Sequence, residues 1–338
     1  MSRSAQPDWI LIEQFGHTTD PTVIAIGQTA KTFTPLERVI KSKSHRTVIL
    51  TALESMQHED SPSRKDFVQS GTRYILEPRT DLSGWTPAVL VHYGPADGEP
   101  PIEPPACGAW HFNVTQGTAH GSVELLDMYQ TPEDQRQNGR PLHEAFLRLV
   151  GHDHEALQKL VEKKPGVTHQ AFETVETDAT DTLESGRWIA HYSCRFVKHD
   201  DTGEVILHGV TRQCGPWTPG TQAPDPQTLT TQVSTQVPIP GLFRLIIDPE
   251  GGNILRTYGE TPPTVPPGAS KLRDLLVSDS TTDHALDHIK AVAKSELPLA
   301  EVTTTGRTGD EARVRIDPIK VGEKTAALVT YWFGDALH

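Results

Sequence analysis

The middle third of the chain concentrates side chains that could do chemistry. Nine of the 16 histidines lie there. The run His152-Asp153-His154 sets two imidazoles beside a carboxylate, a ligand set that suits zinc or nickel. The run falls at a predicted loop-to-helix junction, where polar side chains are expected in any case. We therefore favour a solvated surface and predict no metal site.

Aromatic and histidine side chains of the same segment are the candidate ligand-binding residues. They stand on predicted strands. Aromatic rings and imidazoles that face the inner side of a sheet can line a small-molecule pocket. The alternative is ordinary core packing for the aromatics and a hydrogen-bonded or surface position for the histidines. The candidate set is Trp110, Phe112, Trp188, His191, Tyr192 and His208.

Familiar catalytic motifs are absent from the sequence. It has no P-loop, no glycine-rich dinucleotide fingerprint after a strand, and no Gly-x-Ser-x-Gly elbow. Cys194-Arg195-Phe196 resembles part of the Asn-Cys-Arg-Phe motif of flavin-binding photosensor PAS domains. Here Ser193 replaces the asparagine, and the cysteine falls on a predicted late strand instead of an early helix. We predict no catalytic residue, no cofactor and no enzyme activity.

Two proline-rich segments divide the chain into three parts. Residues 95–105 hold five prolines in eleven residues, and 216–236 are rich in proline, threonine and glutamine. Proline cannot donate a backbone hydrogen bond and favours extended spacers. The predicted domains are therefore 1–95, 106–215 and 237–338.

One order of elements recurs in the three parts. Each begins with two β-rich runs, continues with amphipathic helical segments, and closes with paired strands. In the first part these are strands 9–13 and 22–26, helix 45–57, and strands 73–77 and 86–93. In the third part they are strands 242–248 and 253–258, helices 271–278 and 282–296, and strands 311–316 and 324–333.

The middle part has the same order with longer elements. Its predicted elements are strands 109–114 and 121–126, helices 142–150 and 153–164, and a hairpin of 187–196 with 204–212. This order predicts α+β domains, each a mostly antiparallel sheet with helices packed on it. It is the outline of three tandem PAS/GAF-like domains. Strand alternation does not separate PAS from GAF.

Several segments resemble a family of actinobacterial proteins best known from mycobacteria. They are Asp8-Trp-Ile-Leu-Ile-Glu13 and the Pro-Pro linker running into Trp110-His-Phe-Asn-Val-Thr-Gln-Gly117, together with the tripartite length. The family is described as tandem PAS–GAF–PAS sensor-like proteins without an attached output domain. The resemblance implies a signalling or small-molecule-sensing role. The GAF label of the middle domain rests on the resemblance alone.

Composition limits location and partners. The 338 residues carry a formal net charge of −13, which argues against nucleic acid and anionic lipid as partners. No apolar run approaches the ~20 residues that span a bilayer, and no signal peptide is recognisable. The three cysteines have no CxxC spacing, which favours a reducing compartment. We expect a cytoplasmic protein.

The leading hypothesis is a cytoplasmic sensory or signalling protein that binds a small molecule or a partner protein and has no catalytic output. The alternative is a ligand-free interaction scaffold, and an enzyme is a third reading. A pocket of at least ~300 Å³ would favour the sensor, and solid cores the scaffold. An enzyme would require titratable groups converging in a cleft. A homodimer stays open, because no long heptad segment enforces a coiled coil.

Overall fold

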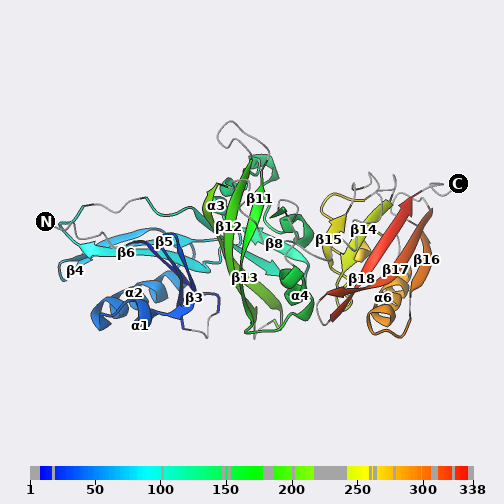
Figure 1. Ribbon diagram of the computed structural model, residues 1–338, viewed down its shortest axis with the longest axis horizontal. Coiled ribbons are helices and arrows are strands. Elements are labelled where there is room, and N and C mark those ends of the chain that lie inside the picture. The colour runs from blue at the N-terminus through cyan, green and yellow to red at the C-terminus, as the bar shows by residue number, and fades with distance from the viewer. Residues whose placement is uncertain are drawn as a thin grey trace.

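Three antiparallel sheets follow one another along the computed structural model, with the two ends of the chain at opposite ends of the row (Figure 1). The structure describes residues 8–16, 20–99, 103–146, 149–150, 154–177, 186–199, 202–216, 242–258, 261, 265–276, 279–297, 299–305, 311–321 and 324–333.

The first sheet has the strand order β3-β2-β1-β6-β5-β4. Its strands are β1 (Ile10–Glu13), β2 (Thr22–Ile26), β3 (Thr29–Pro35), β4 (Lys65–Gln69), β5 (Thr72–Arg79) and β6 (Ala88–Pro95), with helices α1 (Leu36–Val39) and α2 (Lys43–Gln57). The Ser42 hydroxyl accepts a hydrogen bond from the His45 backbone N–H and caps α2. The predicted apolar stripe of this helix is confirmed, because Ile49, Leu53 and Met56 are buried against the sheet.

The second sheet has the order β10-β11-β12-β13-β7-β8-β9. Its strands are β7 (Cys107–Asn113), β8 (Thr118–Gly121), β9 (Arg140–Pro141), β10 (Leu149–Val150), β11 (Thr168–Glu176), β12 (Arg187–Lys198) and β13 (Val205–Pro216). Its helices are α3 (Val123–Met128), η1 (Glu133–Gln135), η2 (Leu142–Phe146) and α4 (His154–Glu162). The predicted hairpin is confirmed, since β12 and β13 pair antiparallel along most of their length.

The third sheet has the order β15-β14-β18-β17-β16. Its elements are β14 (Leu242–Ile247), β15 (Ile254–Tyr258), η3 (Leu272–Asp274), α6 (Asp279–Ala293), β16 (Ala300–Thr305), β17 (Glu311–Val321) and β18 (Lys324–Phe333). The same five-strand order occurs in the first sheet as β2-β1-β6-β5-β4 and in the second as β8-β7-β13-β12-β11. The predicted α+β class, with two strands, helices and an antiparallel meander, is confirmed for all three sheets.

Three predicted elements were wrong in kind or length. A strand is expected at 121–126, but β8 already ends at Gly121. The Ser122 hydroxyl accepts from the Leu125 backbone N–H, and this cap begins α3. Within the described residues of the helix expected at 142–150, the chain forms the 3₁₀ segment η2 and then β10, which pairs with β11. Within the described residues 271–276 of the helix expected at 271–278, it forms the 3₁₀ turn η3.

The middle sheet is held from both sides. On the side of the first sheet, Arg212 Nη1 donates to the Gly27 carbonyl oxygen at 3.0 Å, and Gln170 Nε2 donates to that of Lys31 at 2.9 Å. On the side of the third sheet, α4 contributes Leu157 and Leu160 to a buried cluster. From the third domain that cluster receives Ile246, Leu255, Ile319, Val321 and Ala326.

Candidate functional site

The two faces of the middle sheet do different things. Along β12, Tyr192, Cys194 and Phe196 face a cavity. The intervening Ser193 and Arg195 contact groups on the opposite face: Ser193 binds Gln170 of β11, and Arg195 binds Glu13 of the first sheet. This follows from the twofold alternation of a strand. One face is therefore an interface between domains, and the other is available for a site.

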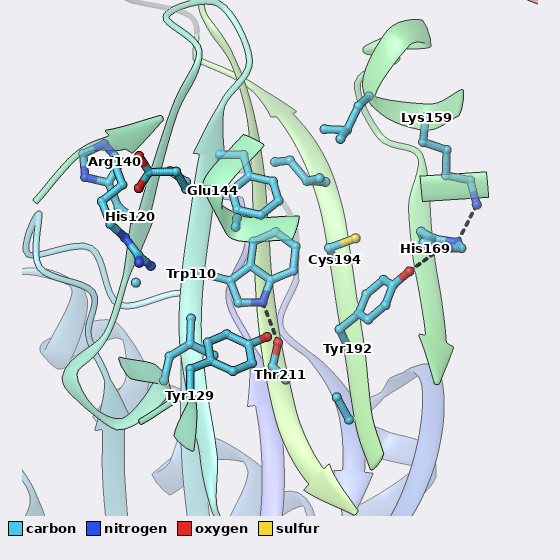
Figure 2. A pocket seen from close by; sticks show the side chains of 18 of the residues that line it. Trp110, His120, Tyr129, Arg140, Glu144, Lys159, His169, Tyr192, Cys194 and Thr211 are labelled. Carbon is cyan, nitrogen blue, oxygen red and sulfur yellow. Dashed lines mark hydrogen bonds between the residues drawn. The ribbon is translucent and has the colours of Figure 1, made fainter. Parts of the chain in front are cut away.

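The cavity measures about 100 Å³ and lies between this sheet and its helices (Figure 2). Trp110 and Phe112 of β7 form an aromatic wall, with ring centroids 4.5 Å apart and an interplanar angle of 29°. Aliphatic groups from α3, α4 and β13 complete the apolar part of the lining, among them Leu125, Leu160 and Leu207. Such a lining suits the apolar part of a small molecule.

The position of the Trp110 ring depends on a glycine in the neighbouring strand. Gly209 of β13 pairs with Trp110 across the sheet, and a Cβ added at Gly209 would overlap the indole ring. The indole Nε1–H donates to the Thr211 hydroxyl at 2.9 Å, inside the buried wall. The ring is thereby fixed in both position and rotation.

A row of three polar side chains forms one side of the cavity (Figure 2). Lys159 of α4 lies with Nζ 2.7 Å from Nδ1 of His169 on β11. The other ring nitrogen of His169, Nε2, lies 3.1 Å from the hydroxyl oxygen of Tyr192 on β12. The row joins a helix to two strands and runs from a cation to a phenol.

A second polar group lies on the other side of Trp110, where Figure 2 shows His120, Arg140 and Glu144 close together. Burial raises the pKa of Glu144, against the opposing effect of Arg140. The pKa of His120 is lowered, chiefly by burial. Nδ1 of His120 lies 2.5 Å from the Asn138 side-chain oxygen, which orients the ring.

The third domain also contributes to the lining. Arg256 of β15 is buried at the cavity, and burial lowers its pKa. Its guanidinium carbon lies 5.6 Å from the Tyr258 ring centroid, within the range of a cation–π contact. Glu173 of β11 acts on Arg256 electrostatically and stabilises its charge. The cavity is therefore completed by a residue from across the domain boundary.

The structure brings together three of the six candidate residues. Trp110, Phe112 and Tyr192 line the cavity. Trp188 does not line it but lies beside it, in a small buried cluster with Val175 and Ala190, its ring centroid 5.8 Å from that of Tyr129 in the lining.

The two candidate histidines lie on the other face of the sheet. The His191 ring centroid is 4.6 Å from that of Phe172, and Nδ1 is 3.5 Å from Arg212 Nη2. His208 has its ring centroid 5.1 Å from that of Trp85, which belongs to the first domain, and 5.7 Å from that of His111. His208 therefore belongs to the interface with the first domain, and His191 lies beside Arg212, which donates to Gly27 of that domain.

Sequence reasoning missed the polar groups of the cavity. Lys159 is a polar residue next to the buried Leu160, and His169 is a polar residue on a β-rich run. Nothing in the sequence indicated that these two side chains are in contact. Of the run considered as a metal site, His152 and Asp153 lie outside the described residues. Within the described ranges, no group of three or more potential metal ligands comes together.

Comparison with known proteins supports part of the resemblance seen in the sequence. Residues 8–102 match the family model described as Rv3651-like, N-terminal. No curated protein matches the chain. The crystal structure of an uncharacterized protein from Mycobacterium tuberculosis superposes with a TM-score of 0.71 at 18% identity, covering 96% of this chain and 95% of that one. The fold is shared over nearly the whole length. The family model thus covers the first part of the chain, the mycobacterial structure shows a shared fold, and neither finding extends to a PAS–GAF–PAS assignment.

Two further structures match with low TM-scores. The periplasmic sensory domain of the Campylobacter jejuni chemoreceptor Tlp1 gives 0.24 at 12% identity, with 69% of this chain and 73% of that chain covered. An RNA-binding light-oxygen-voltage receptor gives 0.25 at 10% identity, with 68% and 96% covered. At these scores neither carries an argument about this chain. Among the helices of the described ranges, none combines the length and the apolar composition needed to cross a membrane.

Proposed function

We propose that this chain is a cytoplasmic sensory protein that binds a small molecule in the middle domain and has no catalytic output of its own. The observation that supports the proposal is the cavity: an aromatic wall, polar groups on two sides, and Arg256 supplied by the third domain. A ligand held there would contact both domains. Its binding free energy would therefore act on the packing between them, which is how a ligand shifts a conformational equilibrium.

We further propose that the three domains are PAS/GAF-type modules. The shared five-strand order and the helices inserted after the opening strands support this assignment. The middle domain deviates most, with the short edge strands β9 and β10 added at the two ends of its sheet. The interaction scaffold remains the alternative for the chain, and it is supported by the first and third domains, whose buried clusters consist of their own apolar side chains.

The volume of the cavity restricts the ligand. At about 100 Å³ it does not reach the ~300 Å³ pocket that would favour a sensor of drug-sized ligands over the scaffold. An engineered apolar cavity of ~150 Å³ admits benzene. The proposal therefore concerns a ligand of a few heavy atoms and excludes a nucleotide or a flavin in this cavity.

A second candidate function, acid–base catalysis on a small substrate, is favoured by one observation. Lys159, His169 and Tyr192 converge on the cavity in a continuous row, and titratable groups in a cleft are the pattern expected of an active site. We place it second because the same hydrogen-bonded row could serve only to orient one side chain toward a bound ligand, without any proton transfer. The two candidates separate by whether a bound probe is recovered chemically unchanged.

The test is native mass spectrometry of the freshly purified full chain, followed by ligand-observed NMR with a mixture of small acids, amides, alcohols and amines. Ala145→Leu fills the cavity from η2, and Ala106→Leu adds the same atoms at an exposed position. We expect a retained mass or a binding probe in the parent and in Ala106→Leu, and neither in Ala145→Leu. If no probe binds the parent at millimolar concentration, the scaffold replaces the sensor. If a probe is chemically converted, the enzyme hypothesis replaces the sensor.

A further inference from the structure

We propose that Asn138 is a site of self-modification, at which the backbone nitrogen of Gly139 displaces the side-chain amide as ammonia while His120 binds the amide oxygen. The modification replaces a neutral amide by a carboxylate next to the cavity. It requires no ligand and therefore goes beyond the proposed function. Three observations carry it: the Asn-Gly pair, the exposed and turned backbone of that pair, and the contact of the amide with a histidine.

Asn138 and Gly139 lie in the loop between η1 and β9. Their sequence is the only Asn-Gly pair of the chain, which has two other asparagines. Asn138 is exposed, and Gly139 has a φ of +82°, which glycine adopts without steric cost. Because glycine carries no side chain, its backbone nitrogen is the least hindered nucleophile that can follow an asparagine. The pair is thus suited to attack of the Gly139 nitrogen on the Asn138 amide carbon.

The amide of Asn138 is bound by His120 of β8. Nδ1 of His120 lies 2.5 Å from the Asn138 side-chain oxygen, and since an amide oxygen only accepts, the imidazole N–H donates to it. Gly139 leaves room for this ring, because an added Cβ would lie 3.3 Å from its Cε1 carbon. A donor at this oxygen stabilises the negative charge that develops there during attack, as the donors of an oxyanion hole do.

The His120 ring is held in place by its own neighbours. It stacks on the ring of His111, with centroids 4.2 Å apart and an interplanar angle of 15°. Nδ1 of His111 in turn lies 2.5 Å from Oδ2 of the buried Asp81. Burial is the main effect that lowers the pKa of His120, so at neutral pH the ring is uncharged with its proton on Nδ1. A donor fixed in this way needs little reorganisation when charge develops on its acceptor.

The reaction has two steps. In the first, the Gly139 nitrogen bonds to Cγ of Asn138, the bond from Cγ to Nδ2 breaks, and Nδ2 leaves as ammonia with the proton that the Gly139 nitrogen gives up. The product of this step is a cyclic succinimide. In the second, water adds to one of the two ring carbonyls and opens the ring to aspartate or isoaspartate. In sum, one amide and one water give one carboxylic acid and one ammonia.

The product would alter two residues of the cavity lining, His120 and Arg140 (Figure 2). A carboxylate in place of the amide would face the His120 ring and favour its charged form. Isoaspartate also adds a carbon to the backbone directly before β9, where Arg140 pairs with Ala119 of β8. Because Arg140 acts on Glu144 in the same lining, a shift of β9 would reach the cavity.

The experiment incubates the full chain at pH 7.4 and 37 °C and follows its three asparagines by peptide mapping. Conversion is read from the mass gain of each peptide, and chromatography separates aspartate from isoaspartate. We expect Asn138 to react at least tenfold faster than Asn113 and Asn253. These two are matched internal controls, because both are buried and each is followed by a β-branched residue.

Two comparisons isolate the contribution of the fold. The folded parent should react at Asn138 at least twofold faster than the same chain unfolded in urea, where the contact with His120 is lost. His120→Leu removes the donor and should slow the reaction at least threefold, whereas His120→Gln keeps an N–H donor and should recover part of the loss. His284→Leu, at an exposed position of α6, should react like the parent. Circular dichroism confirms that each variant is folded, and the comparison with urea needs no variant.

The outcomes bear on separate steps of the inference. A reaction at Asn138 no faster than at Asn113 and Asn253 overturns the site, as does a folded parent that reacts more slowly than the unfolded chain. Equal rates in the parent and in His120→Leu overturn the role of His120. Where isoaspartate forms, hydrogen exchange of the amides of residues 118–121 should be at least threefold faster than in the unmodified chain, and unchanged exchange overturns the effect on the lining. Ligand binding by the cavity is decided by its own test.

Discussion

Arg195 of β12 forms an ion pair with Glu13 of β1 across the boundary between the first and middle domains. Nη2 of Arg195 lies 3.0 Å from Oε1 of Glu13, whose side chain is 0% exposed. The same carboxylate accepts from the Thr22 hydroxyl at 2.6 Å and from the Phe15 backbone N–H at 2.8 Å. Burial raises the pKa of Glu13 and the Arg195 cation opposes that rise. The pair thus fixes the face of the middle sheet that lies opposite the cavity.

Removing one partner of this pair should destabilise the chain strongly. Arg195→Met leaves a buried carboxylate without its cation, and losses of about 3–5 kcal/mol are typical of a broken buried pair. The exposed pair of Arg73 with Asp66 is the matched control, and Arg73→Met should cost much less than Arg195→Met, because solvent screens an exposed pair. Urea unfolding followed by circular dichroism measures both. Equal losses in the two variants would show that burial of the Glu13 pair does not matter.

Two histidines should make the chain less stable in mild acid. Burial lowers the pKa of His143 and of His191 from the usual 6.5 to about 4, with Arg212 adding to the effect at His191. Between pH 6.5 and about 4 the unfolded chain binds protons that the folded chain does not, so the free energy of unfolding falls as pH decreases through this range. The stabilisation that depends on these two neutral histidines is fully present above pH 6.5. It is lost as pH falls, and below about 4 no further loss occurs. Each histidine contributes about 1–3 kcal/mol.

The measurement is the free energy of unfolding between pH 4 and 7.5 for the parent, His191→Gln and His58→Gln. His191→Gln should flatten the curve, because the glutamine does not titrate. His58 is exposed at the end of α2 and serves as the control, so His58→Gln should reproduce the parent slope. A parent slope that persists in His191→Gln would assign the acid sensitivity to other groups.

The contact between Gly209 and Trp110 should appear as an energetic coupling. Gly209→Ala puts a methyl group into the indole ring and should cost about 1–3 kcal/mol, as overpacking of a filled wall does. Trp110→Phe removes the part of the ring that is overlapped. The double variant should therefore be more stable than the sum of the two losses predicts, by about 1 kcal/mol or more. Strict additivity would place the ring elsewhere.

Long amphipathic and alternating segments were predictable because their partners are near in sequence. The hairpin of β12 and β13 shows alternation over many residues, and its turn lies between them. Strands β4 and β16 were missed because they lie at the edges of their sheets. Their composition is polar, as in Lys65–Gln69 and Ala300–Thr305. An edge strand contributes few buried side chains, so its hydrophobic pattern is weak.

The site was predictable only in its aromatic part. Trp110, Phe112 and Tyr192 alternate on strands, and the pattern fixes their face once the strands are known. The same rule separates His191 from its neighbour Tyr192: adjacent strand residues point to opposite faces, so only one of the two can line the cavity. Lys159 of α4 meets His169 of β11 across the cavity, a tertiary relationship with no local signal.

The junction between the middle and third domains should depend on one buried amide. Nδ2 of Asn253, which is 1% exposed, donates to the Val114 carbonyl oxygen at 2.7 Å. Asn253→Ala leaves that carbonyl without its donor and should cost about 1–3 kcal/mol of unfolding free energy. Asn253→Asp should cost more, because a carboxylate would face the carbonyl oxygen with acceptors only. Hydrogen exchange should report faster amides in α4 and β15 in both variants while α2 in the first domain stays protected. Losses below about 0.5 kcal/mol, the range of ordinary surface substitutions, would show that apolar packing of α4 alone holds the two domains together.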